Sequence, residues 1–572
     1  MKRILEFLRP MYGRIVWGLV IKFLGTISEL FLPWILSYMI DDVIPLKRLD
    51  LVFAWGGAML GCCVVCIVGN IVANRNAAAV ARDSTRAIRH ALYEKITYLS
   101  DAQIDRLGVP SLVSRLTTDT YNLHHMVGVV QRMGVRAPIL VVGGILMTLT
   151  LDVPMTLVLA ATVPLIGILV TMVSKKGALI FRSLQTSIDG LVRVIRENIT
   201  GARVIKALSM NGYEVERFAK QNREVSSREV HANEVMGLGR PIMNTLLYIG
   251  QAAVILVGAS RVNSGAAEPG SIVAFLSYFT IIANAMMGVT RLFVVLTRSV
   301  ASANRVSEIL ELSADLTVQA LPSPEPGEFH VEFRDVSFSY NKRRPAIEHI
   351  SFALRRGESL GLIGATGSGK TTIIKLLMRF YDADEGQILI NGRDVRTIEP
   401  DVLHTMFGVA FQNDNVFSDT VRENILLGRE LSDQDIERAA RDAQAAGFIA
   451  GLENGLDEHL NTQGTNLSGG QRQRLLIARA LAARPDILIL DDSSSALDYR
   501  TDADLRQALA RGYAQTTRIL IASRISSIAH CTHILVLDEG RIIGQGAHEE
   551  LLASCAEYQE IARTQMGGMQ SA

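Results

Sequence analysis

The residues best suited to chemistry form one glycine-rich run, Gly364-Ala365-Thr366-Gly367-Ser368-Gly369-Lys370-Thr371, with Thr372 directly after it. The run fits the pattern G-x-x-x-x-G-K-[ST], in which backbone N–H groups wrap a phosphate chain. In such a loop the lysine reaches the β- and γ-phosphates and the final hydroxyl binds Mg²⁺. The run therefore predicts that Lys370 and Thr371 belong to a site for a phosphate chain and Mg²⁺.

Two elements must position this loop. An apolar strand over 359–363 leads into the loop and a helix follows, so the positive end of the helix dipole faces the phosphates. A second apolar strand over 487–490 ends in Asp491 and Asp492. A carboxylate at the end of such a strand holds the Mg²⁺ shell, and we expect Asp491 to fill that role.

The first half of the sequence is apolar enough to cross a membrane several times. Four runs of 20 or more residues contain no Asp, Glu, Lys or Arg: 52–73, 153–174, 241–260 and 271–290. Two further predicted spans, over 15–40 and 137–151, do not meet this criterion of 20 charge-free residues. About 20 helical residues cross the hydrocarbon layer, so the sequence predicts six spans in a lipid bilayer.

Lys22 and Glu29 interrupt the first of these spans. Buried charges in a span can mark a transport pathway. The alternatives are an ion pair with a neighbouring span or a lysine that snorkels to the interface. In the second span, Cys63 and Cys66 form a C-x-x-C pair, which we interpret as small apolar side chains of a helix.

Basic residues set the orientation. Residues 75–115 hold seven Lys and Arg and residues 175–240 hold twelve, whereas the opposite connections hold two, none and one. Because positive residues stay in the cytoplasm, we expect a cytoplasmic N-terminus and a multi-pass protein of the cell membrane, which for a bacterium is the plasma membrane. The net charge of +1 gives no basic footprint, so no nucleic-acid partner is expected.

The chain divides at a proline-rich segment, 321–327, which stops a helix. We predict a transmembrane domain over 1–312 with two helical cytoplasmic hairpins, a linker over 313–327 and an ATP-binding domain over 328–572. After the linker, short strands alternate with helices, which favours an α/β domain with a parallel sheet.

Between the two strand motifs stands a run that identifies the family. Leu467-Ser468-Gly469-Gly470-Gln471 resembles the signature motif of ABC transporter ATPases. The resemblance then covers the whole chain, which looks like a half-transporter of the ABC exporters. It implies an α-helical six-span exporter fold joined to an α/β P-loop NTPase domain with a helical subdomain.

The same resemblance assigns further residues. Tyr340 matches the aromatic residue that stacks on adenine, and Gln412 matches the glutamine that links Mg²⁺ to the membrane domain. The segment 495–498 matches the loop that crosses the dimer interface. The segment 198–207 matches the second cytoplasmic loop, where a coupling helix docks. Two ATPase domains then close head to tail, and each signature acts on the partner's ATP site.

Two positions depart from the family pattern. Asp492 stands where the family places a glutamate as general base, and one methylene less shortens its reach by ~1.5 Å. Ser523 stands where a histidine contacts the γ-phosphate, and a hydroxyl cannot supply imidazolium charge. Both changes fall in the site built on this chain's own phosphate loop, so we expect that site to bind ATP and turn it over slowly.

These departures favour a heterodimer with a second half-transporter whose catalytic residues are intact. We expect export of amphipathic small molecules, lipids or peptides. The alternatives are a nucleotide-gated regulatory or channel-type subunit and a homodimeric exporter with slow ATPase. A soluble ABC ATPase is disfavoured by the six spans, and an importer by the fusion of spans and ATPase in one chain.

Overall fold

The computed structural model describes residues 1–321, 327–412, 415–493 and 496–566. The chain forms two compact units. Unit 1 contains Met1–Tyr98 and Leu107–Leu312, and unit 2 contains Leu99–Arg106 and Ser313–Ala572. Three prolines of the expected linker, at 322, 324 and 326, and Ser495 of the expected interface loop lie outside the described residues.

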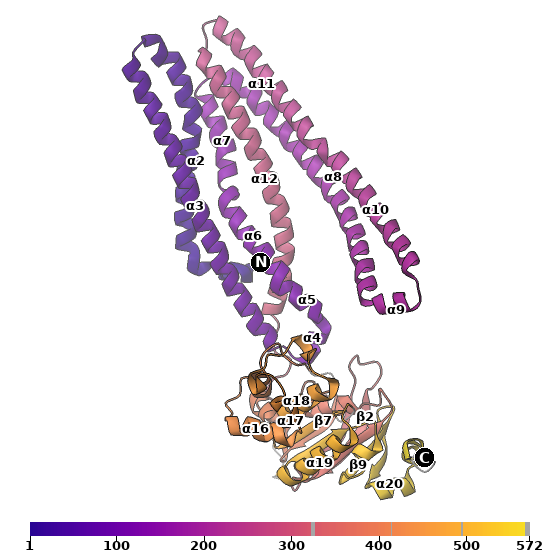
Figure 1. Ribbon diagram of the computed structural model, residues 1–572. Coiled ribbons are helices and arrows are strands. Elements are labelled where there is room, and N and C mark those ends of the chain that lie inside the picture. Colours follow the sequence, from indigo (N-terminus) through magenta and orange to yellow (C-terminus); the bar gives the residue numbers. More distant parts are fainter. Residues whose placement is uncertain (322–326, 413–414, 494–495, 567–572) are drawn as a thin grey trace. The chain divides into compact units, whose positions relative to one another are not determined.

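Unit 1 is built from helices. Its short N-terminal elements are α1 (Lys2–Glu6) and η1 (Arg9–Met11), and its other helices are α2 (Tyr12–Tyr38), α3 (Leu49–Thr97), α5 (Val109–Ser114), α6 (Thr120–Val129), α7 (Arg136–Leu149), α8 (Val153–Thr200), α9 (Ala202–Ala207), α10 (Asn211–Gly237), α11 (Gly239–Asn263) and α12 (Pro269–Leu310). Four short segments connect or extend them: η2 (Met39–Val43), η3 (Ile44–Leu46), η4 (Arg115–Asp119) and η5 (Val130–Gly134). In Figure 1, α8 and α10 run side by side and α9 joins their ends.

Six helical stretches in the described part of the chain are long and apolar enough to span a membrane, which confirms the predicted number. The third of them, Val109–Leu149, combines α5, η4, α6, η5 and α7 into one stretch. The segments η4 and η5 are π-helical turns. No residue in the most apolar window of α3 is fully buried within the protein, as is usual where side chains face lipid.

The two charges of the first span have separate partners. The guanidinium of Arg136 on α7 lies 2.8 Å from a carboxylate oxygen of Glu29, which is the ion pair with a neighbouring span. Lys22 is 3% exposed, and its ammonium donates to the side-chain oxygens of Asn70 and Asn74 at 2.6 and 3.1 Å. Lys22 therefore does not snorkel; it joins α2 to α3 through two amides.

Unit 2 contains two sheets. The four-stranded antiparallel sheet has the order β2-β1-β4-β5 and the six-stranded sheet has the order β10-β9-β3-β8-β7-β6. The strands are β1 (Val331–Phe338), β2 (Ile347–Leu354), β3 (Ser359–Gly364), β4 (Glu385–Ile390), β5 (Arg393–Asp394), β6 (Phe407–Ala410), β7 (Ile487–Asp491), β8 (Thr517–Ile521), β9 (His533–Asp538) and β10 (Arg541–Gly546). The pairs from β9 through β6 are parallel, as predicted, whereas the antiparallel sheet was not predicted.

Helices cover these sheets and form a subdomain between β6 and β7. The helices are α4 (Asp101–Leu107, of which Asp101–Arg106 lie in unit 2), α13 (Lys370–Leu377), α14 (Pro400–Thr405), α15 (Val421–Leu426), α16 (Asp433–Asp442), α17 (Ala446–Ala450), α18 (Gly469–Leu481), α19 (Tyr499–Gly512), α20 (His548–Ser554) and α21 (Ala556–Met566). The short 3₁₀ turns are η6 (Val395–Thr397), η7 (Gly455–Asp457), η8 (Thr462–Gly464) and η9 (Ile525–Ser527). Apolar residues of α15, α16, α17 and α18 share one core with strands β6 and β7, so the helical subdomain is packed onto the sheet.

A buried arginine fixes the subdomain from within. Arg479 of α18 donates to the backbone oxygen of Asn424 at 2.7 Å, to its side-chain oxygen at 3.0 Å and to the backbone oxygen of Asn415 at 2.9 Å. Asn424 is fully buried. These bonds hold α18, which carries the signature motif at its N-terminus, against α15.

We expect Arg479→Met to destabilise unit 2 by about 3 kcal/mol, because several buried acceptors lose their donors. The midpoint of thermal unfolding of the purified chain should fall by about 6 °C or more. Arg472→Met changes an exposed arginine on the same helix and should shift stability by no more than about 0.5 kcal/mol. Equal midpoints for the two variants would contradict this role of Arg479.

Candidate active site

The phosphate loop lies between β3 and α13. Gly369 caps the helix with φ +100°, and a Cβ atom there would lie 2.6 Å from the side chain of Ile347. A Cβ atom on Gly364 would lie 2.0 Å from the backbone oxygen of Leu537. Both positions therefore require glycine. Between them, Ala365, Thr366 and Gly367 are exposed, whereas the Ser368 side chain is buried.

Lys370 folds back over this loop. Its ammonium donates to the backbone oxygens of Gly364 and Ala365, both at 2.8 Å. Burial lowers the pKa of Lys370, and the nearby carboxylates of Asp491 and Asp492 oppose that shift. The loop thus gathers backbone donors and one positive charge at the start of α13, an arrangement suited to a chain of phosphates.

Asp491 closes the site at the end of β7. The side chain is 4% exposed, and burial together with the charge of Asp492 raises its pKa, while Lys370 and a hydrogen bond with Thr371 lower it. A carboxylate beside a threonine hydroxyl offers the hard oxygen ligands that Mg²⁺ prefers. Among the described residues, no cluster of three His, Cys, Asp or Glu suited to a metal is present.

Asp492 adopts a left-handed backbone conformation with φ +48°. Its N–H donates to the backbone oxygen of Ile521 at 2.9 Å, which ties the end of β7 to the end of β8. The side-chain amide of Gln412 donates to a carboxylate oxygen of Asp492 at 3.4 Å. The structure thus brings together three residues that the sequence singled out, Gln412, Asp491 and Asp492, beside the phosphate loop.

Tyr340 follows β1 and is 48% exposed. Its hydroxyl lies 3.3 Å from that of Thr372 on α13, and its ring contacts Tyr381 edge to face with centroids 5.1 Å apart. The Lys375 ammonium lies 5.7 Å from the Tyr340 ring centroid and 5.6 Å from that of Tyr381. An exposed aromatic face beside the phosphate loop can take a flat base.

The signature segment forms the N-terminus of α18. Ser468 and Gln471 make a reciprocal capping box: the Ser468 hydroxyl accepts from the Gln471 N–H at 3.2 Å, and the Gln471 side chain accepts from the Ser468 N–H at 2.8 Å. Leu467 packs against the subdomain core. A Cβ atom on Gly469 would meet nothing within 4 Å, and one on Gly470 would lie 3.1 Å from the backbone oxygen of Ala496.

Two family models match this chain. The model of the ABC transporter transmembrane region matches residues 15–286, and the model described as ABC transporter matches residues 347–495. The uncharacterized ABC transporter ATP-binding protein YfiB of Bacillus subtilis (strain 168) is 33% identical over 569 residues, which cover 99% of each protein. The chain belongs to the ABC transporter family. It is therefore a multi-pass membrane transporter whose second unit binds and hydrolyses ATP.

One further relative and one solved structure are similar to this ABC transporter over most of its length. An ATP-dependent lipid A-core flippase of Syntrophus aciditrophicus (strain SB) is 32% identical over 481 residues, which cover 84% of this chain and 80% of the flippase. The solved structure of a bacterial Atm1-family ABC exporter with ATP bound covers 99% of both chains with a TM-score of 0.82 and 24% identity. The chain thus has the fold of that exporter, as the sequence predicted.

Ser523 of this ABC transporter lies just beyond β8, and its side chain is exposed. A residue that the sequence analysis missed holds its backbone. Gln565 of α21 donates to the Ser523 backbone oxygen at 2.9 Å and accepts from the Ile525 N–H at 2.8 Å. The C-terminal helix therefore fixes the loop that carries Ser523, and nothing in the sequence near Ser523 points to a partner 42 residues away.

A second missed residue joins α18 to the segment that follows β7. Gln473 of α18 donates to the backbone oxygen of Asp492 at 3.1 Å and accepts from the Ala496 N–H at 3.2 Å. Gln473 follows the signature segment by two residues. Its place in the same polar run is the feature of the sequence that could have indicated a role for it. Gln473 thus links α18 to the backbone of Asp492 by a direct hydrogen bond.

Residues 99–106 of this ABC transporter pack as part of unit 2. The Tyr381 hydroxyl donates to a carboxylate oxygen of Asp105 at 2.5 Å, and the Ser100 hydroxyl donates to Asp315 at 2.7 Å. Burial and the nearby Asp105 raise the pKa of Tyr381, so its hydroxyl stays protonated and remains a donor. Residues 99–106 are therefore hydrogen-bonded to Tyr381, the tyrosine whose ring contacts Tyr340.

Proposed function

We propose that this chain is one half of a heterodimeric exporter and contributes its slow ATP site. The carrying observation is the residue pair Asp492 and Ser523, at the positions of a glutamate base and a γ-phosphate histidine. In this proposal ATP binding closes two ATPase domains head to tail, and the spans then release an amphipathic small molecule, lipid or peptide on the far side of the membrane.

The chemistry of the two side chains supports a slow site. A general base must come within hydrogen-bond distance of the proton it removes, and an aspartate reaches ~1.5 Å less far than a glutamate. The Asp492 carboxylate also accepts a hydrogen bond from the side-chain amide of Gln412. The exposed hydroxyl of Ser523 brings no positive charge to a γ-phosphate.

The remaining ATP-site residues are those of a competent binding site. We assign phosphate binding to residues 364–372, base stacking to Tyr340 and Mg²⁺ binding to Thr371, Asp491 and Gln412. When bound, Mg²⁺ would neutralise charge on the phosphates. The capped N-terminus of α18, with Ser468 and Gly470, would serve the partner's ATP, so that a partner with intact catalytic residues hydrolyses ATP against this chain's signature.

Orientation and cargo complete the proposal. The basic residues of the long connections support a cytoplasmic ATPase unit and a bacterial plasma membrane, since the relatives named above are bacterial. The relative named as a lipid A-core flippase supports lipids among the cargo classes. The exposed apolar window of α3 gives such cargo a lipid-facing surface nearby.

The test is to purify the tagged chain twice, alone after expression in a foreign host and in complex from its native membranes. We expect a second half-transporter in the native complex and robust ATP hydrolysis by that complex only. Vigorous hydrolysis by the chain alone would contradict the proposal. Transport is measured in vesicles as ATP-dependent accumulation of cargo against a gradient, which a channel-type subunit would not produce.

The bond between Tyr381 and Asp105 yields a prediction on coupling. Tyr381→Phe removes the donor and keeps the ring beside Tyr340, so ATP binding should be unchanged. A hydrogen bond to a charged group contributes about 1.5–3 kcal/mol, so stimulation of ATP hydrolysis by cargo in the native complex should fall about tenfold. Asp105→Asn keeps an acceptor oxygen and should cost less. Unaltered stimulation in Tyr381→Phe would exclude this contact from coupling.

A further inference from the structure

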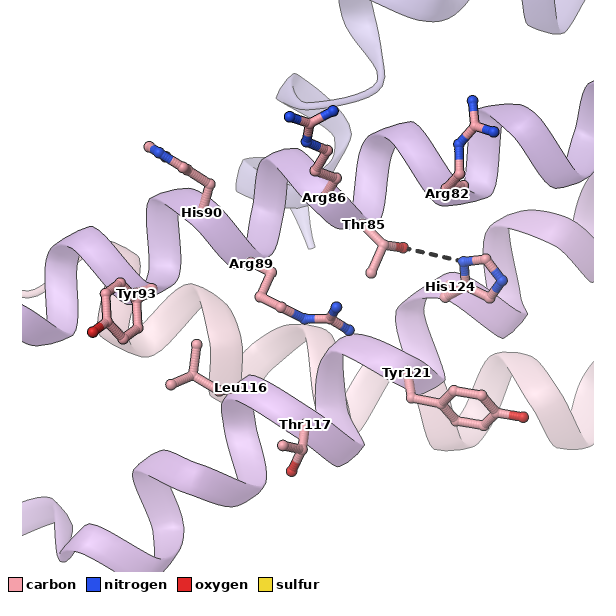
Figure 2. Close-up of a pocket in the computed structure, with 10 residues that line it drawn as sticks. All are labelled: Arg82, Thr85, Arg86, Arg89, His90, Tyr93, Leu116, Thr117, Tyr121 and His124. Atoms are coloured by element: carbon pink, nitrogen blue, oxygen red, sulfur yellow. Dashed lines mark hydrogen bonds between the residues drawn. The ribbon is translucent and has the colours of Figure 1, made fainter. Parts of the chain in front are cut away.

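Unit 1 contains a cavity of about 1020 Å³ between α3 and the segment formed by η4 and α6, but its basic side chains do not converge on one ligand. Figure 2 shows Arg89 pointing from α3 toward the helix that carries His124, whereas Arg86 points to the other side of α3. Arg89 also donates to the Thr120 hydroxyl at 3.2 Å. A side chain that holds one short segment through two bonds lies in unit 2, on the C-terminal helix α21.

The segment that it holds, residues 522–525, continues β8 at the edge of the sheet where the phosphate loop lies. Strand β8 lies between β3 and β7, and both pairs are parallel. Ile521, the last residue of β8, pairs with Leu362 of β3 and with Asp491 of β7. Because the carboxyl ends of parallel strands meet at one edge of a sheet, Ser523 emerges beside the strand that leads into the phosphate loop and beside the strand that ends in Asp491.

The side-chain amide of Gln565 bonds this segment on both sides of Arg524. The amide donates to the Ser523 backbone oxygen at 2.9 Å and accepts from the Ile525 N–H at 2.8 Å. The backbone between the two bonds is extended, with φ −112° and ψ 129° at Arg524. One donor and one acceptor facing an extended residue are what a neighbouring strand would supply, so Gln565 takes the place of a strand partner for this segment.

The buried face of α21 places Gln565 at the segment. Tyr558 is fully buried and Ala562 is 5% exposed, and their spacing of four residues, with Gln565 three residues further on, puts all three on one face of the helix. Tyr558 and Ala562 share one hydrophobic core with Ala522 and Ile525, the two buried ends of the segment. The same face of α21 therefore packs against the segment and bonds its backbone.

We propose that Gln565 is a positioning residue for the triphosphate of ATP: its two bonds hold residues 523–525 so that Ser523 meets the γ-phosphate on this chain's own phosphate loop. A segment that is already held loses less conformational freedom when ATP binds than a free segment would. ADP has no γ-phosphate, so its affinity does not depend on this contact. The role rests on the proposed place of Ser523, and it concerns binding of the triphosphate rather than its hydrolysis.

The test compares the affinity of the full-length chain in nanodiscs for a triphosphate and for a diphosphate. Displacement of mant-labelled ADP by AMP-PNP, a non-hydrolysable triphosphate, and by ADP gives Kd for each nucleotide in the presence of Mg²⁺. Gln565→Met keeps the length of the side chain and removes both bonds. This variant should raise Kd for AMP-PNP about fivefold or more and leave Kd for ADP unchanged, because only the triphosphate uses a hydrogen bond from Ser523 to a charged group.

Gln559→Met is the matched control on the same helix. Gln559 donates to the backbone oxygen of Leu552 at 2.8 Å, outside the segment of Ser523, so the ratio of the two Kd values should stay that of the wild type. An unchanged ratio in Gln565→Met, or an equal change in Gln559→Met, would overturn the inference. Equal loss of affinity for both nucleotides in Gln565→Met would overturn it too, because that result indicates a general effect on the fold.

Ser523→Ala separates this inference from the proposed function, and we expect it to raise the same ratio. If Ser523→Ala keeps the wild-type ratio while Gln565→Met changes it, the assignment of Ser523 to the γ-phosphate is wrong, and Gln565 acts through the backbone of the segment. The assay measures no hydrolysis and contains no partner subunit, so failure of the heterodimer proposal leaves its outcome intact.

Discussion

The double variant Asp492→Glu with Ser523→His is expected to raise ATP hydrolysis by the purified chain alone by about 100-fold or more. The reason is that a positioned acid–base group contributes about 10²–10⁴ in rate. Glutamate restores the reach of the base from the end of β7, and histidine restores a donor that can carry charge beside the γ-phosphate. The measurement is phosphate release at saturating Mg-ATP in nanodiscs.

Two comparisons make that result specific. Adding Lys370→Ala to the repaired chain should abolish the gain, because the gain depends on phosphates held by this chain's own loop. Asp492→Glu alone should recover only part of the rate. No gain from the double variant, in a preparation that still binds ATP, would show that Asp492 and Ser523 do not limit hydrolysis.

Gly470→Asp in the native complex is expected to lower ATP hydrolysis by about 100-fold, the size of effect seen when a preorganised donor to a transition state is lost. Gly470 lies in the first turn of α18, where backbone N–H groups attract anions. A carboxylate there would repel the partner's γ-phosphate, and its Cβ atom would crowd the backbone oxygen of Ala496 at 3.1 Å.

The contrasting variant in the same complex is Lys370→Ala. It changes this chain's own phosphate loop, so it should weaken nucleotide binding there and leave most of the hydrolysis. Photolabelling with an azido-ATP analogue measures occupancy of each subunit, and phosphate release measures turnover. Equal losses of turnover for Gly470→Asp and Lys370→Ala would indicate two equivalent sites and contradict the asymmetric assembly.

Local sequence patterns predicted much of this fold. The glycine run at 364–369 predicts a phosphate loop because its spacing and the flanking strand leave few other structures. The spans follow from runs that contain no charge. The antiparallel sheet of β1, β2, β4 and β5 was missed, because alternating strands and helices later in the domain dominate the pattern, and strand pairing depends on distant residues.

The contacts that position the site were the least predictable part. Gln565 bonds the loop of Ser523 from 42 residues away, and Asp105 reaches Tyr381 from 276 residues away. The sequence around Gln565 or Asp105 contains no local pattern that predicts the hydrogen-bond partner. Likewise, the charge of Lys22 suggested a pathway, an ion pair or snorkelling to the interface, and its two amide partners on α3 emerge only from the packing of the helices.

The membership of residues 99–106 in unit 2 has a practical consequence for biochemistry on this protein. The ATPase body is discontinuous along the chain, so a fragment beginning at Ser313 would lack residues 99–106. In that fragment the Tyr381 hydroxyl would lose its acceptor and the Ser313 backbone oxygen its bond from Gln103. Stabilities measured on such a fragment would describe an ATPase body without these two bonds, and the full-length protein is the proper reference for them.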